Sequence, residues 1–130
     1  MRGPDGDRHV VVGEASYYGA KFHGQQAASG ETFDMHEYTA AHRSLPFDTM
    51  VRVTEQKTLK SVVVRIIDRG PYVDGRVIDL AKRPAKDIGL VRAGVLPVRL
   101  EILRWGGGEN VADRRQRPLR GLAARDSSTR

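Results

Sequence analysis

Short runs of β-branched residues, each bounded by glycine, proline or polar turn residues, constrain this 130-residue chain more than any other feature. The strongest run, SVVVRII, covers Ser61–Ile67, and the run Val95–Leu103 alternates apolar and polar residues as a half-buried strand does. Three further runs have strand character: His9–Tyr18, Tyr38–Arg43 and Thr49–Thr54. The pattern predicts five or six short strands.

One helix is expected at about Ala81–Ile88, because Gly89 can take the left-handed conformation that ends a helix. Pro84 fits only if it lies in the first turn, where its missing N–H is not needed. A single short helix among short strands favours a small closed barrel, which leaves no sheet edge unpaired.

The chain length suits one domain, which we place at residues 9–105, between a flexible leader at 1–8 and an Arg-rich tail at 106–130. The absence of cysteine excludes disulfides, zinc–thiolate sites and cysteine nucleophiles. No window has the roughly 18 apolar residues of a membrane span, and the first residues lack the apolar core of a secretory signal.

The formal net charge of +6 raises the question of a nucleic-acid partner. Six arginines face only three acids from residue 106 onward, so the tail carries about half of this charge. The body of the chain has no aromatic-rich basic strand of the kind that stacks bases. We therefore interpret the tail as a solvated linker or as a segment attracted to anionic polymers, and expect no nucleic-acid partner.

Two adjacent tyrosines lie in a glycine-bracketed stretch, GEASYYG, followed by Phe22 and His23. Flat amphipathic side chains held between glycines suit a surface that binds a flat ligand such as a sugar ring. Tyr18 is expected to face a ligand, whereas Tyr17 could equally close a barrel end.

Polar candidates follow in two segments. In ASGETFD, a turn is expected to point Glu31 and Asp34 outward, either as solvated acids or as ligand-binding ones. In YTAAHRSLP, His42 ends an apolar segment, where a hydrogen bond should orient its imidazole. The other histidines, His9, His23 and His36, show no metal-site spacing, and neither a metal nor a cofactor is expected.

The stretch IIDRGPYVDGRVIDLA contains three aspartates. Asp68 continues the alternation of the preceding strand, so it is expected on the same face as Ile66, at the strand's end. Partial burial there would raise its pKa and favour the protonated form that a general acid needs. Pairing with Arg65 or Arg69 would lower it instead. Asp74, before a glycine, is interpreted as a turn residue.

Six segments, in this order and spacing, closely resemble the rare lipoprotein A (RlpA) family: GEASYYG, KFHG, ASGETFDM, YTAAHRSLP, VVVRIIDRGP and GRVIDLA. The resemblance covers residues 13–103. It implies a mainly β fold, a six-stranded double-psi β-barrel with one or two short helices. The family usually has Asn where this chain has Ile67, and a helix-capping Ser where it has Ala81.

The resemblance further implies a lytic transglycosylase of the bacterial cell envelope that acts, as a monomer, on peptidoglycan glycan strands stripped of stem peptides. Catalytic roles would fall on Asp68, Glu31 and His42. Substrate-binding roles would fall on Tyr17, Tyr18, Phe22, His23, Asp34, Arg69 and Asp79. In such a reaction the muramyl C6 hydroxyl is the nucleophile, so one carboxyl group can first give and then take a proton.

Another class shares this barrel. Expansins loosen walls without cutting glycan, and their key aspartate lies in a segment resembling VIDL, so Asp79 could anchor a groove that only binds glycan. Asp79 could also accept backbone hydrogen bonds at the start of the expected helix. The sequence leaves these alternatives open.

Overall fold

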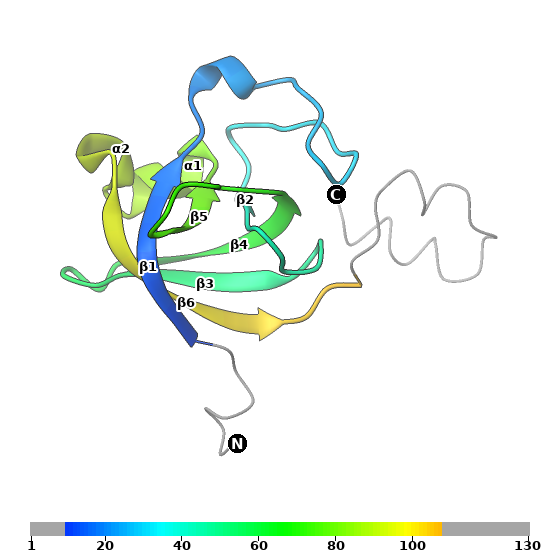
Figure 1. Ribbon diagram of the computed structural model, residues 1–130. Coiled ribbons are helices and arrows are strands. Elements are labelled where there is room, and N and C mark those ends of the chain that lie inside the picture. The colour runs from blue at the N-terminus through cyan, green and yellow to red at the C-terminus, as the bar shows by residue number, and fades with distance from the viewer. Residues whose placement is uncertain (1–9, 108–130) are drawn as a thin grey trace.

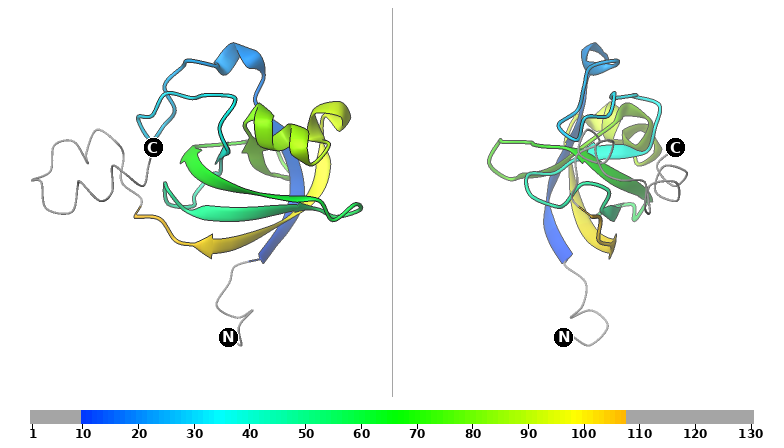
Figure 2. Two further views of the ribbon diagram at one scale, coloured as in Figure 1. Left: turned by 180° about the vertical axis from the view of Figure 1, so that it is seen from behind. Right: turned by 90° about the vertical axis from the view of Figure 1, so that its right-hand side faces the viewer.

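The fold, described by a computed structural model for residues 10–107, is a closed barrel of six strands. Around the barrel the strands follow the order β1-β5-β2-β4-β3-β6 (Figure 1). Two short helices lie together against one side of it, as Figure 2 shows from behind. The elements are β1 (Val10–Tyr17), η2 (Ala20–Phe22), β2 (Thr39–Ala41), β3 (Met50–Glu55), β4 (Ser61–Asp68), β5 (Arg76–Leu80), α1 (Lys82–Asp87), α2 (Leu90–Ala93) and β6 (Leu96–Arg104).

The predicted mainly β barrel is confirmed, and the five predicted strand ranges overlap β1, β2, β3, β4 and β6. The strand for which no range was predicted is β5, in RVIDL. Its five residues include an arginine and an aspartate, so the apolar alternation is short. Pairing with β1 and β2 on either side makes it a strand. The expected leader and most of the expected tail lie outside the described residues.

The helix prediction was accurate to one residue at each end. Pro84 is the third residue of α1 and so lies in its first turn. Ala81 occupies the N-cap position without a side-chain hydrogen bond, as its methyl group requires. Gly89 has φ of +84°, which ends α1 in the left-handed conformation and starts the turn into α2.

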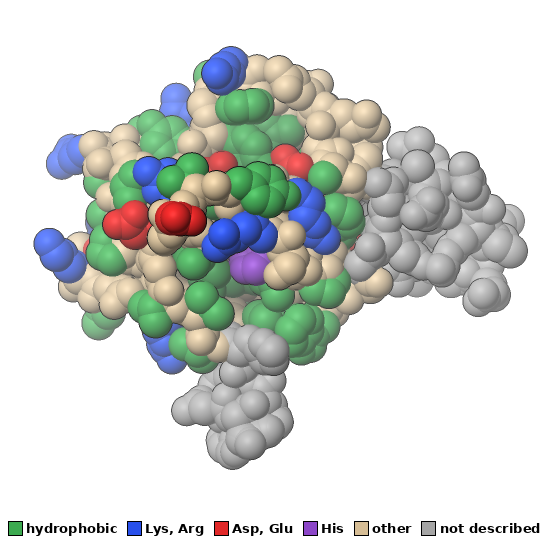
Figure 3. All heavy atoms as spheres, viewed as in Figure 1, with side chains coloured by type: hydrophobic (Ala, Val, Ile, Leu, Met, Phe, Trp, Pro, Cys, Tyr) green, Lys and Arg blue, Asp and Glu red, His purple; other side chains and the backbone are tan. Residues whose placement is uncertain are grey.

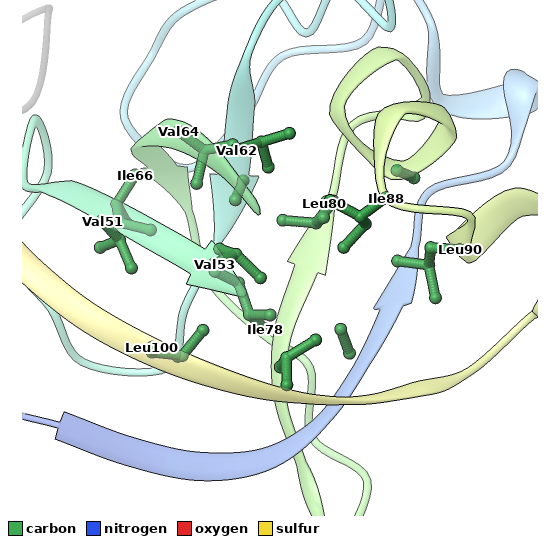
Figure 4. Close-up of a cluster of buried hydrophobic side chains, with 14 of the residues drawn as sticks. Val51, Val53, Val62, Val64, Ile66, Ile78, Leu80, Ile88, Leu90 and Leu100 are labelled. Atoms are coloured by element: carbon green, nitrogen blue, oxygen red, sulfur yellow. The ribbon is translucent and has the colours of Figure 1, made fainter. Parts of the chain in front are cut away.

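The interior of the barrel is filled by aliphatic side chains from all the strands and from the helices (Figure 4). We call this set the barrel core. Its buried members are Ala15, Ala40, Phe47, Val51, Val53, Val62, Val64, Ile66, Ile78, Leu80, Ala85, Ile88, Leu90, Val98 and Leu100.

A second, smaller apolar group lies outside the barrel, beneath the long β1–β2 loop, residues 18–38. We call it the loop cluster. In Figure 1 this loop is the blue-to-cyan trace above the strands. Its buried members are Tyr18, Ala27, Phe33, Ala41, Ile67 and Ala81, with Met35 packed against them.

Candidate functional site

Two adjacent rows of paired residues cross four strands of the barrel, β1, β5, β2 and β4. One row joins Tyr17, Leu80, Ala40 and Ile66, and these side chains belong to the barrel core or pack on it. The next row joins Ser16, Asp79, Ala41 and Asp68. Because neighbouring rows of a sheet face opposite sides, the second row points away from the barrel core, toward the loop cluster.

A bulge at Ile67 sets the direction of Asp68. Along β4, Ala40 pairs with Ile66 and Ala41 with Asp68, so Ile67 is the extra residue. The alternation predicted through Ile66 to Asp68 is therefore wrong, and the two side chains lie on opposite faces. Ile67 itself is 2% exposed and packs in the loop cluster.

Three donors hold the carboxylate of Asp68. The Tyr18 hydroxyl donates to Oδ2 at 2.5 Å, and the backbone N–H groups of Ala28 and Arg69 donate to Oδ1 at 2.8 and 2.9 Å. Neither predicted arginine partner donates to this carboxylate through its guanidinium. Arg65 donates to Glu31 and Asp48 instead, and the Arg69 guanidinium donates to backbone carbonyls. Asp68 is thus fixed by neutral donors from the loop and from its own turn.

Asp79 stands two strands away from Asp68 in the same row, with only the methyl group of Ala41 between them. At roughly 4.8 Å per strand, the two backbones are about 10 Å apart. The Ser16 hydroxyl donates to Asp79 at 2.8 Å. Burial raises the pKa of Asp79, opposed by the Ser16 hydrogen bond and by Arg76, and the nearby Asp68 raises it further.

His42 directly follows β2, and its backbone N–H donates to the carbonyl of Asp68 at 3.1 Å. Its ring is fixed, as predicted: Nδ1 accepts from the N–H groups of Ser44 and Leu45, both at 3.1 Å. The proton of the neutral ring must therefore be on Nε2. Burial lowers the pKa of His42, and Arg69 and Arg43 lower it further. The site holds a neutral imidazole with Nε2–H as its donor.

Glu31 is buried, with 8% exposure, so the expectation that it points outward is wrong. Its carboxylate makes two hydrogen bonds, of 2.7 and 2.9 Å, with the guanidinium of Arg65. Arg65 also donates to Asp48 at 2.9 Å. The sequence missed this ion cluster because its members are 17 and 34 positions apart along the chain.

Both tyrosines pack within the fold, so the expectation that Tyr18 faces a ligand is wrong. Tyr18 is 9% exposed, with its ring stacked on Phe33 at 4.5 Å between centroids, so the ring cannot stack on a ligand. Its hydroxyl reaches Asp68 instead, and burial followed by Asp68 raises the pKa of that hydroxyl. Tyr17 packs against the barrel core, which was the structural alternative for it. Phe22 remains partly exposed and meets Tyr18 edge-on.

The turn after β4 carries two further groups. The Arg69 guanidinium donates to the carbonyls of His42 and Leu45 and lies 4.0 Å above the ring centre of Phe47. Tyr72, which sequence reasoning did not select, is 74% exposed. An aromatic residue directly after the turn sequence DRGP was the available indication. Asp74 lies in a turn and is exposed, as predicted.

On the barrel face drawn in Figure 3, acidic, basic and histidine side chains lie among hydrophobic ones over the middle of the fold. Two other predicted residues, His23 and Asp34, lie on the β1–β2 loop beside His36. The sequence showed no metal-site spacing for these histidines, yet the fold brings them together with an acid. Among residues 10–107, no helix has the length and apolarity needed to span a membrane.

Comparison with known proteins adds a family. Residues 10–100 match the family model described as lytic transglycolase. A probable endolytic peptidoglycan transglycosylase RlpA of Aquifex aeolicus is 51% identical over 96 residues, 74% of this chain and 42% of that protein. The endolytic peptidoglycan transglycosylase RlpA of Vibrio cholerae is 50% identical over 91 residues, 70% of this chain and 35% of that protein. The chain spans about two-fifths of the length of these relatives.

Solved structures support the fold. Streptomyces papain inhibitor superposes with a TM-score of 0.61 at 19% identity, over 74% of this chain and 96% of that one. A Clavibacter michiganensis expansin variant in complex with cellohexaose superposes with a TM-score of 0.59 at 19% identity, over 74% of this chain and 51% of that one. With the family match, these likenesses confirm the predicted double-psi β-barrel.

Proposed function

Since the chain belongs to the RlpA family, we propose that this domain is an endolytic lytic transglycosylase that cleaves peptidoglycan glycan strands and leaves 1,6-anhydro-muramyl ends. Strands stripped of stem peptides are the proposed preference. The observation that supports the proposal is the row in which Asp68 and Asp79 lie on either side of Ala41, facing away from the barrel core. Each of the two carboxyl groups is only partly buried, so a glycan lying along this face can contact both.

Asp68 is the residue we assign to proton transfer. It would give a proton to the glycosidic oxygen as the bond from that oxygen to C1 of the muramyl ring breaks. The C6 oxygen of the same ring would then bond to C1, and its proton would return to Asp68. Because Tyr18, Ala28 and Arg69 hold the carboxylate in one place, the same group can serve both steps.

Asp79 supports this chemistry through its raised pKa. A carboxyl group that keeps its proton to higher pH can donate a hydrogen bond to a sugar oxygen, as a carboxylate cannot. It also places less negative charge beside Asp68 when the latter is ionised. We assign Asp79 to substrate binding.

His42 and Glu31 act differently in this proposal. The neutral imidazole of His42 donates through Nε2 to the sugar or to the oxygen that develops charge. Glu31 is a positioning residue, because its carboxylate is bonded to Arg65 and its segment carries Ala28, a donor to Asp68. In place of the predicted catalytic role, we assign Glu31 to fixing the position of the loop.

The remaining predicted residues form the surroundings of the glycan. Exposed aromatic surface for sugar rings is offered by Phe22 and by Tyr72. Tyr17, Tyr18 and Arg69 support the site from beneath, while His23 and Asp34 lie further along the loop. We place the domain in the bacterial cell envelope, where its substrate is found, and propose that it acts as a monomer.

The test is product formation from amidase-treated sacculi, which carry bare glycan strands. Wild-type protein should release fragments with 1,6-anhydro ends, identified by mass spectrometry, and Asp68→Asn should lower the rate by about 10²-fold or more. Asp74→Asn, in an exposed turn, is the matched control. Release of anhydro products by Asp68→Asn at the wild-type rate would refute the assignment.

The expansin-like alternative is decided by the same preparation. If the wild-type protein cosediments with the sacculi but releases no anhydro product, the domain binds glycan without cutting it. In that case Asp79→Asn should weaken cosedimentation, because Asp79 would anchor the glycan.

A further inference from the structure

Three side chains with metal-binding atoms come together on the β1–β2 loop, separate from the row that contains Asp68. They are His23, Asp34 and His36, and one ligand atom from each lies within 4.8 Å of the others. Nδ1 of His23 is 3.9 Å from Oδ1 of Asp34. The two imidazole rings meet edge-on with centroids 5.6 Å apart.

Hydrogen bonds within the loop explain why Asp34 and His36, which follow His23 by 11 and 13 positions, lie close to it. The N–H of Gly24 donates to the carbonyl of Phe33 at 2.9 Å, and the N–H of Phe33 donates to the carbonyl of Gln25 at 2.7 Å. A further bridge pairs Gln26 with Thr32. His23 directly precedes this paired stretch and Asp34 directly follows it, so the pairing itself places them opposite each other.

The hydrogen bonds at the cluster show which atoms are available. Nδ1 of His23 accepts the N–H of Met35 at 3.2 Å, so this nitrogen carries a lone pair and faces the Asp34 side. Oδ1 of Asp34 accepts the N–H of His36 at 2.9 Å, which fixes the carboxylate without using all its lone pairs. A metal ion at this point would replace the long Met35 bond.

We propose that His23, Asp34 and His36 form a binding site for a first-row divalent cation of the Zn²⁺ class. Two imidazoles and one carboxylate are donors that suit such ions, whereas Ca²⁺ and Mg²⁺ require oxygen donors. Ligands about 2.0–2.1 Å from Zn²⁺ at tetrahedral angles lie roughly 3.4 Å apart. The ligand atoms are 3.9 Å apart for His23 and Asp34 and within 4.8 Å of one another for all three residues, so these side chains must move closer together to bind the ion. The side chains of His23 and Asp34 are over two-fifths exposed, so the ion can enter and keep water as a further ligand.

The ion would hold together the two ends of one segment of the loop. Residues 24–33 lie between the ligands, and this segment supplies Ala28, whose N–H bonds Asp68, and Glu31, which bonds Arg65. Joining His23 to Asp34 and His36 ties the two ends of that segment. The inference does not depend on glycan cleavage, since the site would bind the ion whatever the domain does to its substrate.

Titration of the tag-free, chelator-treated full chain with Zn²⁺, followed by calorimetry, tests the site. The wild type should bind one ion and unfold at a higher temperature with Zn²⁺ than without it. Loss of an outer-shell partner weakens metal binding by about 10–100-fold. His36→Gln removes a direct ligand, so this variant should bind Zn²⁺ roughly 100-fold more weakly or worse. It should also lose the increase in unfolding temperature. Glu37→Gln, an exposed neighbour outside the cluster, should behave as the wild type.

Histidine side-chain NMR identifies the ligands directly. Zn²⁺ should shift the imidazole resonances of His23 and His36 and leave that of His42 unchanged. Equal Zn²⁺ affinity in the wild type and His36→Gln, or shifts at other histidines only, would overturn the proposal. The cluster would then be a histidine–carboxylate contact that fixes the loop without an ion.

Discussion

The barrel core and the loop cluster are both apolar, but they are enclosed in different ways. The barrel core is surrounded by paired strands and closed by the helices, and its buried members are all hydrophobic. The loop cluster has strands beneath it and only the β1–β2 loop above it. That loop is joined to the barrel by polar contacts: Tyr18 and Ala28 to Asp68, and Glu31 to Arg65.

This difference separates stability from function within one small domain. The backbone hydrogen bonds of a closed barrel persist when a side chain at the site changes. The loop, in contrast, is held partly by the carboxylate that we assign to chemistry, so a change at the site also loosens the loop. Substitutions in the two regions should therefore be distinguishable by comparing unfolding with activity.

The largest expected effect comes from the ion cluster under the loop. Arg65→Ala leaves Glu31 and Asp48 without the guanidinium that they share, and should lower the free energy of unfolding by about 3–5 kcal/mol, as loss of one buried partner does. Chemical denaturation measures the change. Arg83→Ala is the control, because Arg83 pairs with Asp87 within α1 at 54% and 33% side-chain exposure and should cost much less stability. Equal costs would mean that the loop does not depend on this cluster.

The neighbouring isoleucines Ile66 and Ile67 compare the two regions directly, because the bulge places one in each. Replacing either with Ala should lower the unfolding free energy by about 2–4 kcal/mol, through lost burial and a cavity. Only Ile67→Ala should also lower the turnover of fully folded protein, since Ile67 packs with Tyr18. Denaturation and glycan-release assays below the melting temperature measure both. A larger activity loss in Ile66→Ala would contradict the separation.

Tyr18→Phe should have a smaller effect, because the ring still stacks on Phe33 and only the bond to Asp68 is lost. A hydrogen bond to a charged group contributes about 1.5–3 kcal/mol, and we expect a stability loss at the lower end of that range with an activity loss of roughly tenfold. Tyr38→Phe removes an exposed tyrosine–aspartate bond, to Asp87, and is the control. It should lose stability without losing activity. If both variants retain full activity, Tyr18 does not position Asp68.

The smallest expected effect is a gain in stability. Because the folded-state pKa of Asp79 is raised above 3.8, the folded protein binds this proton more tightly than the unfolded chain does. The group therefore destabilises the fold as pH rises from about 3.8 through the folded pKa. Asp79→Asn should raise the melting temperature at pH 7, and the gain should disappear at pH below 3.8. Thermal unfolding across this range measures it, and a gain that grows on acidification would contradict the sign.

The fold was largely predictable because its signals are local. Runs such as Ser61–Ile67 alternate over enough residues to identify a strand, and Gly89 and Pro84 fix the helix from within a few positions. The missing strand, β5, has only five residues, and its pairing with β1 and β2 is not a local property.

The candidate site was predicted residue by residue, and the roles of its residues stay predictions. The segments that resemble the RlpA family singled out Asp68, Glu31 and His42, and the family match supports the resemblance. Their surroundings were not predicted. The alternation rule placed Asp68 on the wrong face because one inserted residue reverses every position after it. Glu31 was expected in solvent because its partner Arg65 is 34 residues away.

By itself the sequence determined the strand runs, the short helix with its ends, the lack of thiol chemistry and the identity of the side chains that can do chemistry. Only the tertiary structure decided which way those side chains point and what they contact. The row from Ser16 to Asp68, the Tyr18 bond and the meeting of His23 with Asp34 all join distant segments. Propensity and alternation act over a few residues, whereas pairing across strands and loops depends on how the closed barrel brings distant residues together.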